Sequence, residues 1–193
     1  MFIRDDSARQ FFLTLLLILQ PVPSLVATHE MEFHKLPIHR LSPRVFPKLP
    51  RGIVHALESS GYTIPQLWVT KGGDLDGIPH NVIQGSFRKR GHLDWAVLCS
   101  RNDSSAIVIF WRGNASDTTM LAHSSDDDWT QSIDEQRNLG YSRLLMVASP
   151  NRILRDNPGR KPLHDGIEDY FEGKASSIYY FEQGQLLELE GAD

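Results

Sequence analysis

The densest cluster of reactive side chains in the chain runs from His164 to Asp169. Imidazole and carboxylate groups bind divalent ions and move protons, so His164, Asp165 and Glu168 are the candidate catalytic residues of a metal-assisted or acid–base hydrolase. A structural interpretation competes with this one. Asp165 would cap a short helix over residues 166–171, and Glu168, three residues further on, would complete a capping box. Capping is the simpler interpretation, so we assign no catalytic residue from this cluster.

A second cluster is basic and precedes a central apolar run. Arg88, Lys89, Arg90 and His92 lie within five residues of one another. We expect Arg88, Arg90, His92 and Asp94 to form a binding site for an anionic partner. The alternatives are a solvated loop for the cations and, for Asp94, a side chain that accepts hydrogen bonds from nearby backbone N–H groups and orders the loop. Four such residues are few for a nucleic-acid site.

The single cysteine, Cys99, excludes an intrachain disulfide. Paired with a histidine such as His92, it could act as a nucleophile. Reactive cysteines usually occupy electropositive, partly exposed positions. Cys99 instead ends an apolar run, and free cysteine is among the most buried residue types. We therefore interpret Cys99 as a core residue.

Two acidic segments carry the side-chain types of a cation site. Asp74 and Asp76 occupy alternate positions of a glycine-rich loop, but no bidentate Glu follows them at the spacing of an EF-hand. Residues 126–128 are three consecutive aspartates, which point in different directions on a helix. A favourable interaction with a helix N-terminus explains them without a ligand. We therefore predict no metal ligand and no cofactor.

The elements that position these side chains are expected to be mainly strands. Two apolar runs, residues 95–99 and 106–111, flank the turn-forming residues 101–105. This arrangement predicts a β-hairpin buried on both faces, because neither run alternates polar with apolar residues. Further strands are expected at residues 82–83, 144–148, 177–182 and 185–190, of which the last two form a second hairpin.

Three short helices complete the prediction. One begins at Pro50 and ends at Gly61, with proline at the start and glycine at the end as helices prefer. A second, over residues 126–137, would be capped by Ser125, and the third is the short helix over 166–171. The sum predicts an α+β fold in which one mainly antiparallel sheet of about five or six hairpin-connected strands is covered by two or three short helices.

The stretch from Gly85 to Trp111 resembles a single FG-GAP or VCBS-type repeat. The shared pattern is Gly85-Ser86-Phe87, then Gly91, then the strand Asp94-Trp95-Ala96-Val97. In that family, which includes the blades of integrin-like β-propellers, an acidic loop ahead of such a strand binds calcium. Calcium needs about six to eight oxygen ligands, whereas Arg88 and Arg90 stand where the family has ligands. The resemblance therefore implies a loop–strand unit without calcium, and one copy is too few for a propeller.

The first 27 residues have the order of a secretory signal peptide. Two arginines precede an apolar run over residues 11–19, and Leu25-Val26-Ala27 offers a cleavage site. The run is shorter than the roughly 20 apolar residues that span a bilayer. An uncleaved interfacial anchor or a buried helix is the alternative. The whole chain also resembles small exported bacterial proteins of unknown function, and we expect a periplasmic or secreted protein. After the signal peptide we expect an extended linker over 28–49 and one globular domain over 50–193.

Composition narrows the class of partner. The 193 residues carry a formal net charge of −4 and are 40% hydrophobic, as in ordinary globular proteins. Without a global excess of basic residues, neither nucleic acid nor an anionic membrane surface is expected as the main partner. Nor is stable membrane insertion expected once the signal peptide is removed. We expect an exported, non-catalytic binding or accessory module for an unknown protein or small molecule. The alternative is the hydrolase, which would require His164 and a carboxylate to converge on one open pocket.

Overall fold

The computed structural model describes residues 32–69 and 73–191. The predicted signal peptide, residues 1–27, and the start of the predicted linker lie outside the described residues. From Glu32 on, the chain forms one compact unit by its internal contacts. None of the helices in the described ranges is long and apolar enough to cross a membrane.

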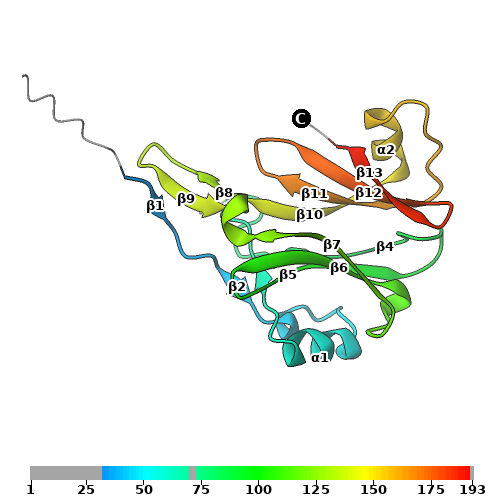
Figure 1. Cartoon of the computed structure of the whole chain (residues 1–193), viewed down its shortest axis with the longest axis horizontal. Helices are drawn as coiled ribbons and strands as arrows, with labels where there is room; N and C mark the ends of the chain where they lie inside the picture. The colour runs from blue at the N-terminus through cyan, green and yellow to red at the C-terminus, as the bar shows by residue number, and fades with distance from the viewer. Residues whose placement is uncertain (1–31, 70–72, 192–193) are drawn as a thin grey trace, which may run out of the picture. The chain divides into compact units, whose positions relative to one another are not determined.

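The prediction of an α+β fold built on one sheet is wrong, because the described residues are mainly β. They form thirteen strands in four sheets, with two α-helices and three short 3-10 helices (Figure 1). Two antiparallel sheets of four strands dominate. The first sheet contains β4 (Val82–Gly85), β5 (Asp94–Arg101), β6 (Ser104–Phe110) and β7 (Thr118–Ser125). The second contains β10 (Arg143–Ala148), β11 (Gly166–Phe171), β12 (Ser176–Glu182) and β13 (Gln185–Glu190).

The two sheets lie face to face, and a helix covers the outer face of each (Figure 1). α1 (Arg51–Ser59) lies under the first sheet, and α2 (Pro150–Asp156) lies above the second. This layering explains why β5 is apolar at successive positions. Val97 belongs to the core shared with α1, whereas the neighbouring Leu98 belongs to the core between the two sheets. The expected hairpin buried on both faces is confirmed.

Both predicted hairpins are confirmed, and their turns explain their register. Asn102 and Asp103 join β5 to β6 with φ of 52° and 55°. Gln183 and Gly184 join β12 to β13 with φ of 51° and 84°. Two-residue turns with positive φ at both positions match the right-handed twist of paired strands. The apolar runs and the turn formers between them therefore located both connections, although the first turn is shorter than the predicted segment 101–105.

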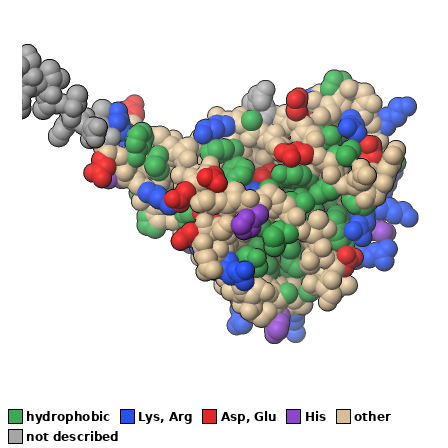
Figure 2. Space-filling model, viewed as in Figure 1, with side chains coloured by type: hydrophobic (Ala, Val, Ile, Leu, Met, Phe, Trp, Pro, Cys, Tyr) green, Lys and Arg blue, Asp and Glu red, His purple; other side chains and the backbone are tan. Residues whose placement is uncertain are grey.

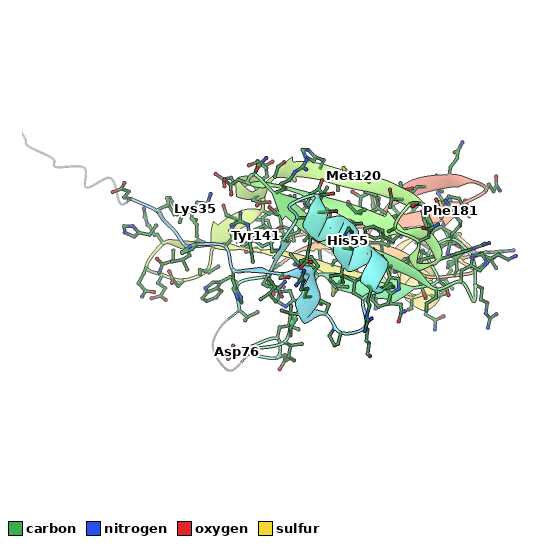
Figure 3. The ribbon with its side chains drawn as sticks, turned by 90° about the horizontal axis from the view of Figure 1, so that it is seen from below. Lys35, His55, Asp76, Met120, Tyr141 and Phe181 are labelled. Carbon is green, nitrogen blue, oxygen red and sulfur yellow. The ribbon has the colours of Figure 1, made fainter. Side chains whose placement is uncertain are left out.

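The predicted helix from Pro50 to Gly61 is confirmed with slightly different ends. α1 has Pro50 at its N-cap, and Gly61 follows it with a φ of 74°, a conformation that glycine adopts without strain. Ile53 and Leu57, one turn apart, are buried against the first sheet. Figure 3 shows α1 lying across that sheet, with His55 labelled on the helix.

The predicted helix over residues 166–171 is wrong, since these residues form β11 between β10 and β12. The capping-box interpretation fails with it. Successive side chains of a strand point to opposite faces, and both acidic residues of β11 find a cation. Asp169 pairs with Arg143 of β10, and Glu168 pairs with Arg152 of α2, each at 2.7 Å. The acidic positions looked solvent-facing in the sequence because their partners are distant along the chain.

The predicted helix over residues 126–137 is also wrong. The segment forms the 3-10 helix η3 (Asp126–Trp129) and then the start of a hairpin made by β8 (Thr130–Ser132) and β9 (Asn138–Tyr141). The cap at Ser125 is confirmed, because its Oγ accepts from the Asp127 N–H at 3.3 Å. The Asp134 carboxylate accepts from the Asn138 N–H at 3.0 Å and orders the hairpin turn.

The part of the predicted linker that the structure describes packs on the rest of the unit. β1 (His34–Lys35) pairs with β9, and β2 (Arg40–Leu41) pairs with β3 (Ile64–Pro65). The 3-10 helix η1 (Pro43–Val45) follows, and Phe46 and Leu49 enter the core beneath the first sheet. The remaining 3-10 helix, η2 (Trp111–Gly113), directly follows β6.

Candidate functional site

Two connections that are far apart in the sequence are bound to each other at one end of the two sheets. The β4–β5 connection covers residues 86–93, and the α2–β11 connection covers residues 157–165. The Ser86 N–H donates to a carboxylate oxygen of Asp165 at 2.9 Å, and the Asp165 N–H donates to the Ser86 carbonyl at 3.1 Å. This reciprocal pair places the predicted basic cluster beside His164.

A cavity of about 590 Å³ opens where these two connections meet the β12–β13 turn. We call it the basic pocket. Figure 2 shows Lys and Arg side chains gathered at this end of the sheets, on the right of the view. The wall of the basic pocket combines cations, aromatic rings and an amide group from the two connections and the β12–β13 hairpin. The lining residues are Arg88, Lys89, Arg90, Lys161, Leu163, His164, Tyr180, Phe181, Glu182 and Gln183.

Arg88 is the best-anchored cation of the basic pocket. Its guanidinium carbon lies 4.1 Å from the ring centroid of Trp111 and 5.2 Å from that of Phe181. One terminal nitrogen is 3.8 Å from Asp117, and its Nε is buried without a hydrogen-bond partner in the part of the chain described. Stacking on aromatic rings holds a guanidinium in place while its N–H fork remains suited to a carboxylate or phosphate.

The other cations of the basic pocket are less restrained. Lys89, Arg90 and Lys161 are exposed and have no ion-pair partner among residues 32–69 and 73–191. The single carboxylate in the wall, Glu182, already pairs with Arg160 at 2.8 Å. The pocket therefore has an excess of positive charge that the described residues do not neutralise.

His164 is part of the pocket wall and has a fixed orientation. Its ring stacks on Tyr180 with centroids 4.5 Å apart and 20° between the planes. Its Nδ1 lies 2.9 Å from the Asp165 carbonyl oxygen, which can only accept, so Nδ1 carries the proton of that hydrogen bond. The Tyr180 hydroxyl accepts from the Leu163 N–H at 2.9 Å. These contacts join the α2–β11 connection to β12.

Asp94 is fully buried beneath the basic pocket and orders the β4–β5 connection. One carboxylate oxygen accepts from the N–H groups of Phe87 and Arg88 at 3.0 and 3.1 Å. The other accepts from the Arg112 N–H at 2.9 Å. The interpretation of Asp94 as an acceptor for nearby backbone groups is therefore confirmed. The position of Arg88 depends on it, although Asp94 itself lines no part of the cavity.

His92, another predicted binding residue, lies on the same connection but is not among the lining residues of the pocket. Its carbonyl oxygen accepts from the Ser86 hydroxyl at 2.9 Å. The Gly91 N–H donates to that hydroxyl at 3.2 Å. These two bonds close the turn that carries Lys89 and Arg90, so His92 contributes through its backbone to the shape of the turn.

The three candidate catalytic residues of the hydrolase alternative do not converge. His164 faces the basic pocket, the Asp165 carboxylate accepts from the Ser86 N–H, and Glu168 lies on β11 against α2. Glu168 also accepts from the Ser176 hydroxyl at 2.7 Å. Within the described ranges, no three His, Cys, Asp or Glu side chains lie close enough to hold a metal ion.

Three further sequence candidates, Cys99, Asp126 and Asp127, have structural partners. Cys99 is buried, its thiol donates to the Ala106 carbonyl at 3.6 Å, and burial raises the pKa of that thiol to about 12. A thiol with so high a pKa is a poor nucleophile at neutral pH. Asp126 accepts from Ser100 at 2.6 Å and from Arg40 at 2.8 Å, and Asp127 pairs with Lys35.

Sequence reasoning missed several contributions to the basic pocket, Leu163 and Gln183 among them. Lys161 belongs to a segment punctuated by proline and glycine that carried no other signal, and Phe181 and Glu182 belong to the predicted second hairpin. A basic residue close to His164 in the sequence was the one available hint. A second cavity of about 620 Å³ lies beside Trp68 and has a mainly apolar wall.

Comparisons with protein-family models, curated proteins and solved structures found no match to this chain. The resemblance of residues 85–111 to an FG-GAP or VCBS-type repeat stays a prediction. In the structure this stretch forms the end of β4, the basic connection, β5 and β6. We therefore infer function from the geometry of the basic pocket.

Proposed function

We propose that the protein is an exported, non-catalytic binding module that holds an anionic ligand in its basic pocket. The observation that carries the proposal is the convergence of Arg88, Lys89 and Arg90 with Lys161 around one cavity. Ligand pockets commonly have volumes of roughly 300–1,000 Å³, and this cavity of about 590 Å³ falls within that range.

Charge and anchoring both favour an anion. Arg88 is fixed against two aromatic rings, so little side-chain freedom is lost when it binds a carboxylate or phosphate. Lys89 and Lys161 add charge from two different connections, which suits a ligand with more than one negative charge. The aromatic and aliphatic lining from Phe181 and Leu163 offers contact to an apolar part of the same ligand.

The hydrolase alternative has weaker support. General acid–base catalysis needs a positioned donor and acceptor within about 3 Å of the reacting group. The Asp165 carboxylate is engaged by a backbone N–H, and Glu168 by Arg152 and Ser176. Only His164 of the three lines the cavity.

Titration calorimetry at low ionic strength tests the proposal, with citrate as the probe. We expect the full chain to bind citrate and the R90E/K161E variant to bind it at least ~10-fold more weakly, since two attractive charges become repulsive. The matched control is K48E/R51E, which reverses two cations on the α1 side and should bind like the wild type.

Three results would overturn the proposal. The first is equal citrate affinity in the pocket variant and the control, and the second is the absence of citrate binding by the wild type. The third is turnover of chromogenic carboxylic or phosphate esters that the wild type catalyses and the H164A variant does not. Thermal unfolding of each variant verifies that the substitutions, all at surface positions or at the pocket wall, leave the fold intact.

A further inference from the structure

The two most exposed large aliphatic side chains of the described residues belong to the two connections that form the basic pocket. Leu163 is 75% exposed and Leu93 is 59% exposed. Leu163 follows Lys161 by two residues, and Leu93 follows Arg90 by three. Single exposed aliphatic side chains are common on protein surfaces. These two differ from the others because each belongs to a connection that also carries cations of the basic pocket.

Both leucines are held in position by ordered backbone. The Leu163 N–H donates to the Tyr180 hydroxyl at 2.9 Å. Leu93 lies between His92, whose carbonyl accepts from Ser86, and Asp94, whose carboxylate holds three backbone N–H groups. Their exposure is thus a property of the folded connections, which also carry Lys89 and Arg90.

We propose that this end of the two sheets docks reversibly on an anionic membrane surface, an inference that rests on the anion-binding function proposed for the basic pocket. Leu93 and Leu163 enter the boundary between headgroups and acyl chains. Arg88, Lys89, Arg90 and Lys161 contact lipid phosphates, and one headgroup phosphate occupies the pocket. Apolar side chains surrounded by Lys and Arg are the pattern of proteins that bind at the membrane interface, and each basic residue near an anionic surface adds attraction.

The combination of residues favours a membrane over other polyanions. A nucleic acid or an acidic polysaccharide would neutralise the cations and leave both leucines in water. A lipid surface accommodates both, since its phosphates lie directly above apolar chains. From the sequence, the net charge of −4 argued against a membrane partner. Salt screens charges over roughly 8–10 Å, however, so a membrane surface attracts the nearby cations and is little affected by the net charge of the whole chain. The acidic remainder instead favours a single orientation, with the basic end toward the lipids.

A fluorophore placed at Leu163 tests the docking in the full chain. Cys99 is the single native cysteine and is buried, so an L163C variant can be labelled selectively with an environment-sensitive dye. The matched control is M120C, because Met120 is 53% exposed on β7 and lies away from the pocket residue Phe181 (Figure 3). Vesicles of phosphatidylcholine alone are compared with vesicles that contain equal amounts of phosphatidylcholine and phosphatidylglycerol.

We expect a blue shift of the dye at position 163 with the phosphatidylglycerol vesicles, none with phosphatidylcholine alone, and none at position 120 with either. The local readout separates this surface from any contribution of the N-terminal residues to binding. In the L163C background, L93S together with K89E should weaken docking. The lipid concentration that produces half of the blue shift should then rise at least ~10-fold. High salt should also reduce the shift.

Three outcomes would overturn the inference. They are the absence of a shift at position 163, an equal shift at position 120, and a shift that L93S/K89E does not alter. If citrate still binds the pocket while the dye reports no lipid, membrane docking fails and the anion-binding function stands. If neither citrate nor vesicles bind, both fail. Binding of single-stranded RNA with unchanged dye emission on vesicles would indicate a nucleic-acid partner and would likewise overturn it.

Discussion

Two arginines of this protein stack on tryptophan rings and differ in what surrounds them. Arg143 lies between the two sheets, fully buried, with its guanidinium carbon 3.9 Å from the Trp129 centroid. Arg88 lies in the basic pocket at nearly the same distance, 4.1 Å, from Trp111. The aromatic contact is common to both, so it does not distinguish a structural arginine from a ligand-binding one. The two arginines differ instead in the hydrogen-bond partners of their guanidinium groups.

Arg143 has its donors satisfied inside the protein. Its Nε and one terminal nitrogen donate to the two carboxylate oxygens of Asp169 at 2.8 and 2.7 Å. That same terminal nitrogen also donates to the Ala122 carbonyl at 3.2 Å, and the other terminal nitrogen donates to the Ser105 hydroxyl at 3.1 Å. Arg88 has one carboxylate at 3.8 Å and a buried Nε with no partner in the described structure. We infer that the first arginine stabilises the fold and the second is available to a ligand.

The largest expected effect comes from breaking the buried pair. Asp169→Asn leaves Arg143 charged and without its counterion in the core, which should lower the free energy of unfolding by about 3–5 kcal/mol. Chemical denaturation measures it. The control replaces both partners, in R143M/D169L, and should lose less stability than D169N alone, because no charge is then left unpaired. A loss below about 1 kcal/mol for D169N would show that water reaches Arg143.

The next effect concerns the support beneath Arg88. Asp94→Ala removes the acceptor of three backbone N–H groups, two of which belong to the β4–β5 connection. We expect the free energy of unfolding to fall by about 1–3 kcal/mol and citrate affinity to fall with it. Asp94→Asn retains one carbonyl acceptor and should lie between the wild type and the alanine variant. Unchanged citrate affinity in D94A would show that citrate binding does not depend on the hydrogen bonds of Asp94.

A third prediction concerns the pH dependence of stability and the half-buried His80, which, like Arg143, has its hydrogen bonds inside the protein. The Nε2 of His80 accepts from the Leu67 N–H at 2.6 Å, and its Nδ1–H donates to the Ile78 carbonyl at 2.9 Å. Burial lowers the pKa of His80, against the raising effect of the Ile78 hydrogen bond. The unfolded chain therefore binds more protons below pH 6.5, and stability falls as the pH drops through that value, by at most about 1.4 kcal/mol per pH unit.

Thermal unfolding at pH 7.5 and pH 5 measures this effect. The His80→Gln variant should be less stable than the wild type at pH 7.5 and should show a smaller difference between the two pH values. An identical pH dependence in H80Q would mean that other groups titrate on unfolding.

The smallest expected change in stability belongs to Arg88. Because its charge pair with Asp117 is long and partly exposed, Arg88→Ala should alter the free energy of unfolding by less than about 1 kcal/mol. Citrate affinity should nevertheless fall several-fold, and Arg88→Lys should recover it only in part, since lysine lacks the planar fork. A large loss of stability in R88A would assign Arg88 the same structural role as Arg143.

Part of this fold could be predicted from short stretches of sequence, because the signals are local. Turn residues at 102–103 and 183–184 located both hairpins, and Pro50 and Gly61 bracketed α1. The apolar runs that do not alternate indicated burial on both faces of β5 and β6. The helices expected over 126–137 and 166–171 failed for the opposite reason. Their acidic residues fitted the pattern of helix caps, whereas in the structure they pair with cations of distant segments.

The sequence by itself determined the two hairpins, the helix α1, the burial of Cys99 and the presence of a basic cluster, since these depend on neighbouring side chains and on backbone dihedral preferences. Only the tertiary structure decided that Asp169 is buried against Arg143, that the two sheets lie face to face, and that Arg88 and Lys161 share a pocket. Each of these depends on contacts between segments that are distant in the sequence. Residues 86 and 165, for example, whose hydrogen bonds join the two connections, are 79 positions apart.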